Sequence, residues 1–119
     1  MATADVKPKS YAFALDVVHA VQALHGRKEF VLSDQLLRAG TSIGANVEEA
    51  NAAQSKREFT AKMSIASKEA REAHYWIRLL RDAGYLPIAS SSDLAEKCQE
   101  LIRMLTAIVK TSQLRDKRA

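Results

Sequence analysis

The stretch from Arg38 to Phe59, RAGTSIGANVEEANAAQSKREF, has the pattern of a helix with one apolar side, followed by the start of a second helix. Apolar or small residues recur in it at alternating steps of four and three, the spacing that lines one side of a bundled helix. Counted from Leu36, these positions are Gly40, Ile43, Val47 and Ala50. Ser55 then precedes Glu58 in an S-x-x-E capping box, which is typical of a helix N-terminus. The stretch therefore predicts two helices, each with one buried side, joined by a short turn.

Several residues on this buried side are unusual for a helix. Gly40 and Gly44 each carry a penalty of about 1 kcal/mol relative to alanine in a helix interior. Ser42 and Asn46 bring polar groups close to the seam, the row of positions that faces the other helices. A buried amide there must find hydrogen-bond partners. Small side chains let two helix backbones approach closely, so the glycines either relieve crowding inside the bundle or form an interface between copies of the chain. Asn46, beside Val47, could hydrogen-bond across helices or face solvent.

The whole chain divides into four helical segments. We expect helices over residues 10–25, 33–52, 55–83 and 91–112, followed by a frayed charged tail at 113–119. Gly26 and Gly84 are expected to end the first and third helices, and Ser33-Asp34 to cap the second. Because each segment has one apolar side, the four can bury these sides only against one another. We predict a single all-α domain over residues 1–119, an up-down-up-down antiparallel four-helix bundle.

The composition agrees with one modest helical domain. The 119 residues are 47% hydrophobic but only 6% aromatic, which favours helix over sheet. The single cysteine, Cys98, excludes an internal disulfide framework and a cysteine-rich zinc site. Its position in phase with Leu94, Leu101 and Leu105 predicts a core side chain. No apolar run is long enough for a membrane span, and we expect a cytoplasmic protein with no membrane partner.

The third helix carries two surfaces besides its seam. One is basic and contains a single aromatic residue; its members are Arg57, Lys68, Arg71, Tyr75 and Arg78. The other is an apolar stripe of Ile65, Trp76 and Leu79. A simple bundle needs only one apolar side per helix, so the stripe, together with Gly40 and Gly44, is a candidate interface between copies of the chain. The alternative is that the stripe covers the edge of the bundle.

Catalytic and metal chemistry find little support in the sequence. A di-iron bundle needs paired Glu-x-x-His motifs, whereas Glu72 and His74 are spaced to lie on different faces of their helix. His19, His25 and His74 share no ligand spacing, and neither a G-x-S-x-G elbow nor a glycine-rich phosphate loop occurs. Glu69 and Glu72 are expected in ion pairs with nearby cations, within the chain or across an interface. We predict a protein that is not an enzyme and that holds no metal or cofactor.

Three short motifs resemble those of a known family. The pattern R-A-x-x-S-I-x-x-N-[IV]-x-E is matched by Arg38, Ala39, Ser42, Ile43, Asn46, Val47 and Glu49; S-x-x-[ED]-F is matched by Ser55, Glu58 and Phe59; I-A-x-x-x-x-x-E is matched by Ile65, Ala66 and Glu72. In these motifs the chain is similar to the four-helix-bundle proteins encoded in 23S rRNA intervening sequences, which are related to the accessory variability proteins of retroelements. Ser42, Asn46, Glu49 and Glu72 are the polar residues of the shared motif.

The resemblance implies a ring-shaped homopentamer, and the relatives that work with reverse transcriptases imply a basic accessory ring. The formal net charge of +4 permits such a role, and assembly into a ring would multiply it. We expect electrostatic binding of RNA, DNA or a nucleic-acid enzyme through the basic face of the third helix. Strong sequence specificity is not expected, since no recognition module is present. The alternative is a structural or protein-partner adaptor whose mixed-charge surface is only solvated.

Overall fold

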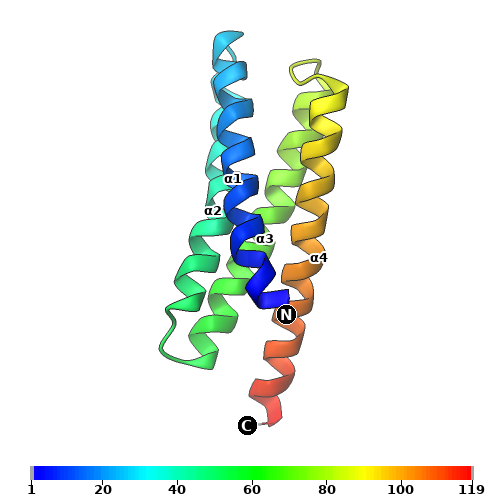
Figure 1. The fold of residues 1–119 in the computed structure, drawn as a ribbon. Helices are drawn as coiled ribbons and strands as arrows, with labels where there is room; N and C mark the ends of the chain where they lie inside the picture. Colours follow the sequence, from blue (N-terminus) through cyan, green and yellow to red (C-terminus); the bar gives the residue numbers. More distant parts are fainter. Residues whose placement is uncertain (1, 119) are drawn as a thin grey trace.

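The computed structural model describes residues 2–118, with placed side chains for residues 5–115. It contains α1 (Ala2–Gly26), α2 (Val31–Asn51), α3 (Lys56–Asp82) and α4 (Ile88–Arg118). The helices run alternately up and down, with α1 and α2 on one side of the molecule and α3 and α4 on the other (Figure 1). α1 packs on α2 and α4, and α3 packs on the same two helices, which closes an elongated body of 51 × 21 × 19 Å. The predicted all-α four-helix bundle is confirmed.

One continuous core follows the seams of the four helices. Its fully buried members include Val6, Phe13 and Val17 in α1, Leu36, Ile43 and Val47 in α2, Met63, Ala66, Ala70, Ala73, Ile77 and Leu80 in α3, and Cys98 and Leu105 in α4. Burial of each large aliphatic side chain contributes about 1.5–3 kcal/mol relative to exposure. The residues that recur at alternating steps of four and three in α2 and α3 are therefore the ones that form the core.

The glycines of α2 serve the packing of this helix on α1. A Cβ atom at Gly40 would lie 2.8 Å from both γ-carbons of Val17, and one at Gly44 would lie 3.4 Å from the carbonyl oxygen of Ser10. Gly40 is buried and Gly44 faces the α1 backbone, so α1 approaches α2 closely at both positions. Within one chain, both glycines thus face α1, Gly40 fully buried and Gly44 half-buried.

The first helix starts earlier than its sequence pattern suggested. α1 begins at Ala2 instead of near residue 10, and Pro8 lies inside it. Proline removes one backbone donor from a helix. Val6, in the turn that precedes Pro8, is completely buried, so this turn packs on the core. Packing of this turn offsets the missing hydrogen bond.

The second helix has a different N-terminal arrangement from the one predicted. α2 begins at Val31, and Ser33 is a buried residue inside it. The Ser33 amide donates to the Glu29 carboxylate at 2.8 Å, and its hydroxyl donates to the Glu29 carbonyl oxygen at 2.8 Å. Glu29 therefore satisfies a free N–H group of the first turn, the role expected of the Ser33-Asp34 pair.

The capping box and the glycine terminator of α3 are confirmed. The Glu58 amide donates to the Ser55 hydroxyl at 3.0 Å, and the Glu58 carboxylate accepts from the Gln54 amide at 3.0 Å. After Asp82 the chain turns at Gly84, whose φ of +85° is the left-handed conformation that ends many helices.

The fourth helix is longer at both ends than predicted. α4 starts at Ile88, directly after Pro87, and continues to Arg118 through the segment expected to fray. Ser91 is buried and its hydroxyl donates to the Ile88 carbonyl oxygen at 3.1 Å, so it is an internal residue. No glycine or proline follows residue 112 to end the helix. Residue 119 lies outside the described residues.

Candidate nucleic-acid and assembly surfaces

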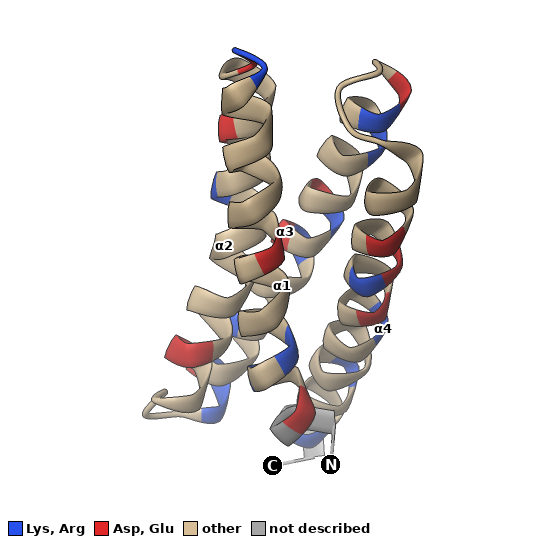
Figure 2. Cartoon of the chain, turned by 45° about the horizontal axis from the view of Figure 1, so that its top comes forward, with Lys and Arg blue, Asp and Glu red and all other residues tan. Residues whose placement is uncertain are grey.

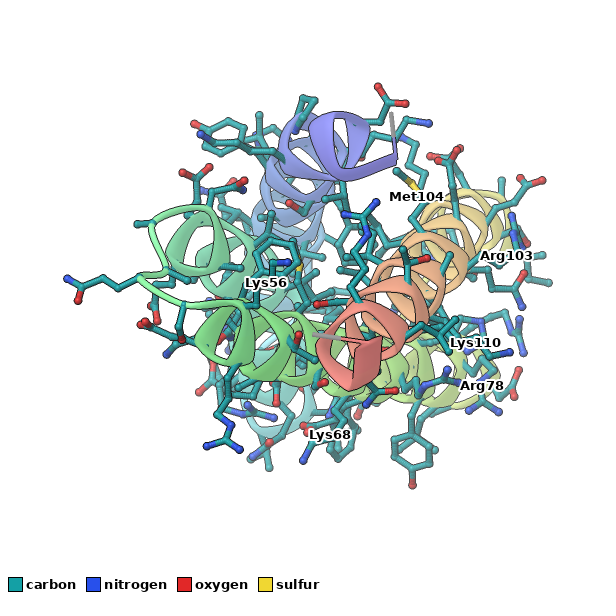
Figure 3. All side chains as sticks on the ribbon, turned by 90° about the horizontal axis from the view of Figure 1, so that it is seen from below. Lys56, Lys68, Arg78, Arg103, Met104 and Lys110 are labelled. Atoms are coloured by element: carbon teal, nitrogen blue, oxygen red, sulfur yellow. The ribbon has the colours of Figure 1, made fainter. Side chains whose placement is uncertain are left out.

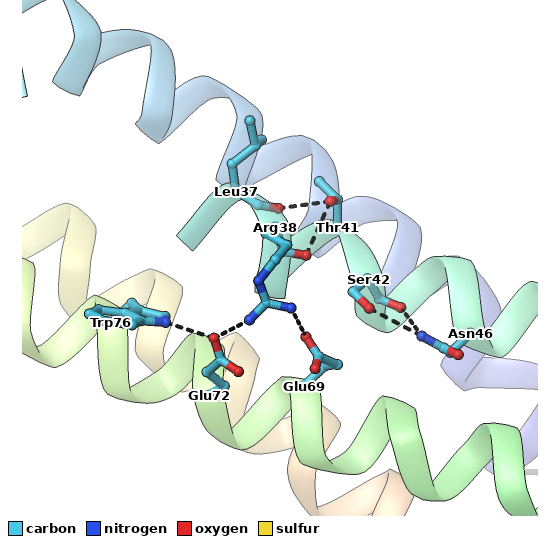
Figure 4. Close-up of polar contacts among 8 residues, drawn as sticks. All are labelled: Leu37, Arg38, Thr41, Ser42, Asn46, Glu69, Glu72 and Trp76. Carbon is cyan, nitrogen blue, oxygen red and sulfur yellow. Dashed lines mark hydrogen bonds and ion pairs between the residues drawn. The ribbon is translucent and has the colours of Figure 1, made fainter. Parts of the chain in front are cut away.

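The edge of α3 that faces α2 carries a polar cluster built around Arg38 (Figure 4). The Arg38 guanidinium of α2 donates to the Glu69 carboxylate at 2.8 Å and also to the Glu72 carboxylate. The indole N–H of Trp76 donates to the same Glu72 oxygen at 3.0 Å. We call Arg38, Glu69, Glu72 and Trp76 the Arg38 cluster. The cluster fixes two acidic side chains and the tryptophan of α3 to one arginine of α2.

The hydrogen bonds of the Arg38 cluster favour its ionised forms. The hydrogen bonds from Trp76 and then Arg38 lower the pKa of Glu72, and the two carboxylates raise the pKa of Arg38. The sequence predicted ion pairs for Glu69 and Glu72, but with cations close to them along the chain. It did not identify Arg38, which lies on another helix. The single positive charge of Arg38 therefore offsets part of the two negative charges that Glu69 and Glu72 carry along the α2 edge of α3.

The other polar residues of the family-like motif make local contacts. The Asn46 amide donates to the Ser42 carbonyl oxygen at 2.9 Å and to the Ser42 hydroxyl at 3.1 Å, both within α2. The hydrogen bond across helices considered for Asn46 does not form inside one chain. Glu49 pairs with Lys62 of α3 at 2.7 Å. The motif thus combines one internal α2 contact with two links from α2 to α3.

The apolar stripe of α3 lies beside the Arg38 cluster and is only partly covered. Ile65 is 39% exposed and Leu79 is 36% exposed, while Trp76 is half-buried against the core. The alternative that the stripe covers the edge of the bundle thus holds for Trp76, whereas Ile65 and Leu79 remain available to a partner.

The basic face predicted on α3 is exposed along its length. Arg57, Lys68, Arg71, Tyr75 and Arg78 are all exposed. Where side chains are placed, none of the four cations forms an ion pair with a carboxylate. The Arg71 guanidinium donates to the Thr106 hydroxyl of α4 at 3.0 Å, and that of Arg78 lies 5.9 Å from the centre of the Tyr75 ring. The cations therefore keep most of their charge available to a partner.

A residue of α4 extends the basic face and was missed. The Arg71–Thr106 contact brings the two helices together, and Lys110 lies one turn beyond Thr106 on α4. Lys68, Arg78 and Lys110 project outward from the side formed by α3 and α4 (Figure 3). No spacing rule in the sequence could have placed Lys110 beside α3, because the contact depends on how the two helices pair.

A histidine lies at the inner border of the basic face. His74 is half-buried, and the pKa of its imidazole is lowered by burial and by the positive charges of Arg78 and Arg81. The neutral form of His74 is therefore favoured in the folded protein. The basic face holds fixed positive charge next to a group that can accept a proton.

The opposite side of the bundle has paired charges. Lys9 of α1 bonds to Glu100 of α4 at 2.7 Å, and Lys97 of α4 bonds to Asp16 of α1 at 3.0 Å. Asp93 also pairs with Lys97 at 3.1 Å. Basic and acidic segments alternate along this part of α4 (Figure 2). Cations on this side are neutralised locally, in contrast to those of the basic face.

Neither a metal centre nor a membrane span is found in the part of the chain that the structure describes. Within residues 2–118, no group of three or more His, Cys, Asp or Glu side chains is placed to hold a metal ion. No helix in the described part of the chain has both the length and the apolar character to cross a membrane. The buried Cys98 donates its thiol to the Ala70 carbonyl oxygen at 3.1 Å and is part of the core, as predicted.

The fold and the arrangement of these residues can be compared with known proteins. The family model of the 23S rRNA-intervening sequence proteins matches residues 2–107. The chain belongs to this family. The resemblance seen in the three sequence motifs is thus confirmed. No significant match exists among curated proteins.

A solved family member has the same fold. It is a protein of unknown function from the S23 ribosomal protein family of Bacteroides thetaiotaomicron, 41% identical to this chain. The match covers 92% of this chain and 99% of that chain, with a TM-score of 0.89. The four-helix bundle described here is therefore shared with another member of the family.

Proposed function

We propose that this family member is a non-catalytic helical bundle that binds nucleic acid electrostatically, with little sequence specificity. The observation that carries the proposal is the division of charge on α3. Its acidic residues Glu69 and Glu72 are paired with Arg38, whereas Lys68, Arg71 and Arg78 form no ion pair with a carboxylate among the placed side chains of residues 5–115. A helix with mixed charge in sequence therefore presents a positive face in space.

Such a face suits a polyanion better than a compact ligand. Phosphate groups of a nucleic acid are contacted by lysine and arginine, and the release of condensed counterions makes binding strongly salt-dependent. The basic face follows α3 over more than five turns, from Arg57 to Arg78, about 30 Å along the helix axis. A ligand with repeated negative charges can contact several of these cations at once.

We further propose that copies of the chain assemble through the apolar stripe. Ile65 and Leu79 are exposed next to the half-buried Trp76, and a second copy would remove these side chains from water. The family resemblance makes a ring of five the expected assembly. A ring would repeat the basic face around its circumference and raise the local positive potential.

RNA is the first nucleic acid to test. The names of the matched family and of the solved relative refer to 23S rRNA and to the ribosome. These names concern those proteins, but they make an RNA ligand a reasonable starting point for this chain. The contacts would be to the phosphate backbone, so DNA should bind as well.

The test is a titration of labelled RNA and DNA oligonucleotides, followed by fluorescence anisotropy at two salt concentrations. We expect binding at low salt that weakens steeply as salt is raised. The variant Arg71→Gln/Arg78→Gln should bind less tightly and show a shallower salt dependence, by about 0.7 per lost contact to a single strand. Absence of binding at low salt would contradict the proposal and favour a structural or protein-partner adaptor.

A matched control separates the basic face from total charge. Lys7→Gln/Lys97→Gln removes the same charge from the α1 side, where both lysines are paired with carboxylates. Exposed ion pairs of this kind contribute about 0–1 kcal/mol, so the fold should persist. If this control weakens binding as much as the Arg71→Gln/Arg78→Gln variant, the basic face is not the binding site.

A further inference from the structure

Tyr75 distinguishes the basic face from a simple array of cations. Its side chain is 49% exposed, although it is a large aromatic residue. It lies four residues after Arg71 and three before Arg78, on the same side of α3. An exposed ring is therefore carried between two arginines whose Cα atoms lie about 10 Å apart along the helix axis.

The ring of Tyr75 is supported from within the bundle. The Trp76 ring meets it edge-on, with centroids 5.0 Å apart and planes at 75°. Trp76 is in turn held by its hydrogen bond to Glu72, which also accepts from Arg38. The Arg78 guanidinium lies over the ring, 5.9 Å from its centre. The tyrosine ring is thus backed by a chain of contacts that reaches α2, while about half of its surface remains open.

We infer that Tyr75 is a stacking platform for an unpaired base, so that the basic face binds single-stranded nucleic acid in preference to duplex. The inference rests on the proposed function. In single-strand binding proteins, bases stack on aromatic side chains while adjacent cations contact the backbone. Here the base lies on the side of the Tyr75 ring that Arg78 does not cover, and Arg71 and Arg78 contact phosphates on either side of it.

A duplex cannot use this arrangement in the same way. Its bases are stacked on their neighbours and expose only their edges in the grooves, so the ring can reach a base face only at a duplex end. The cations still attract the phosphates of a duplex, and duplex binding therefore persists at low salt. The difference between the two ligands is the stacking contribution of Tyr75.

The experiment compares one oligonucleotide as a labelled single strand and as a blunt duplex, using the full chain and the variants Tyr75→Ala and Tyr75→Phe. We expect Tyr75→Ala to weaken single-strand binding by about 5- to 150-fold, the factor that corresponds to one stacked base. Its duplex affinity and the salt dependence of single-strand binding should not change. Tyr75→Phe keeps the aromatic ring and should retain single-strand affinity.

The outcomes separate this inference from the proposed function. If both ligands bind in a salt-dependent way but Tyr75→Ala binds the single strand as tightly as the wild type, the stacking inference is wrong and the proposed function stands. If neither ligand binds at low salt, both are wrong. Equal losses for the single strand and the duplex, with an altered unfolding midpoint, would show that Tyr75 is structural and also overturn the inference.

Discussion

Gly40 and Val17 touch where α1 packs on α2, and the contact leaves no room for a methyl group. A Cβ atom at Gly40 would lie 2.8 Å from both γ-carbons of Val17, whose branched side chain is fully buried and cannot rotate away. Gly40→Ala should lower the free energy of unfolding by about 1–3 kcal/mol through overpacking. Urea denaturation measures this change.

Gly44→Ala is the matched control for that substitution. Its Cβ would lie 3.4 Å from the nearest atom, an ordinary contact, and alanine has the higher helix propensity by about 1 kcal/mol. We expect Gly44→Ala to be neutral or stabilising. The double variant Gly40→Ala/Val17→Ala should be less destabilised than the sum of the two single variants, and equal effects of the two glycine substitutions would contradict the packing argument.

Cys98 should be inert in the folded protein. Burial raises the pKa of its thiol to about 12, so almost no thiolate exists at neutral pH. A disulfide-exchange reagent such as DTNB should react at a rate set by unfolding and not by the intrinsic chemistry of the thiol. Rapid reaction under native conditions, as fast as in urea, would show that α3 and α4 separate near Cys98.

His74 should make stability depend on pH below neutrality. Its folded-state pKa is lowered by burial, Arg78 and Arg81, so the unfolded chain binds the proton more readily. The stability that it contributes is therefore complete above the unfolded pKa of about 6.5 and decreases as pH falls below it. His74→Gln should flatten the curve of unfolding free energy between pH 7.5 and 5.5.

The exposed His19 of α1 provides the comparison for this measurement. The His19→Gln variant removes an imidazole from another helix and shows what the loss of any histidine does to the measured profile. If the His74→Gln profile also follows the wild type, the neutral imidazole of His74 is not what couples folding to pH.

At the residue scale, the sequence predicted core positions better than polar contacts. Cys98 and the α3 seam are buried as expected, because an alternating spacing determines which side of a helix is inside. Arg38 and Glu69 are 31 residues apart, and no periodicity relates residues on different helices. Their pairing required the register between α2 and α3, which only the packed structure provides.

At the scale of the element, helix boundaries followed packing more than local signals. Ser55 and Gly84 marked the ends of α3 correctly, since capping and left-handed conformations depend on neighbouring residues. The predicted start of α1 near residue 10 was too late, because the buried Val6 extends the helix to the N-terminal side of Pro8. Ser33 resembled a cap, yet Glu29 takes that role from the preceding loop.

The apolar stripe of α3 gives the prediction for assembly. Ile65→Lys/Leu79→Lys should convert the proposed oligomer to a monomer while keeping helicity and the unfolding midpoint, because both side chains are exposed in one chain. Size-exclusion chromatography with light scattering measures the mass. Leu15→Lys, at a 47% exposed position on α1, is the control and should leave the mass unchanged.

Two results would contradict the assembly prediction. A wild-type chain that is monomeric at micromolar concentration would show that the stripe needs no second copy. A Leu15→Lys variant that also becomes monomeric would show that the interface lies on α1 and not on α3.

At the scale of the whole molecule, the two helical hairpins are joined at the end opposite the α2–α3 turn. The Arg27 guanidinium, from the α1–α2 loop, donates to the carbonyl oxygens of Gly84 and Tyr85 at 3.0 and 2.6 Å. It also lies 5.3 Å from the centre of the Tyr85 ring. One loop is thereby attached to the other, which fixes the relative height of the α1–α2 and α3–α4 pairs.

The four-helix architecture was predictable because four seams of matched spacing have few other ways to be buried together. The distribution of charge over the assembled surface was not predictable from residue order. Acidic and basic residues alternate along α3, and only the partner supplied by α2, Arg38, ties Glu69 and Glu72 to one edge beside the positive face. The candidate site therefore emerges from tertiary packing.

Trp76 is the only tryptophan of the chain, and it contacts Tyr75 through its ring and Glu72 through its indole N–H. Its intrinsic emission is therefore an optical probe built into the protein. Quenching during an RNA titration would report events at the tyrosine, and a spectral shift on dilution would report dissociation of subunits. Both processes can be followed in unlabelled protein.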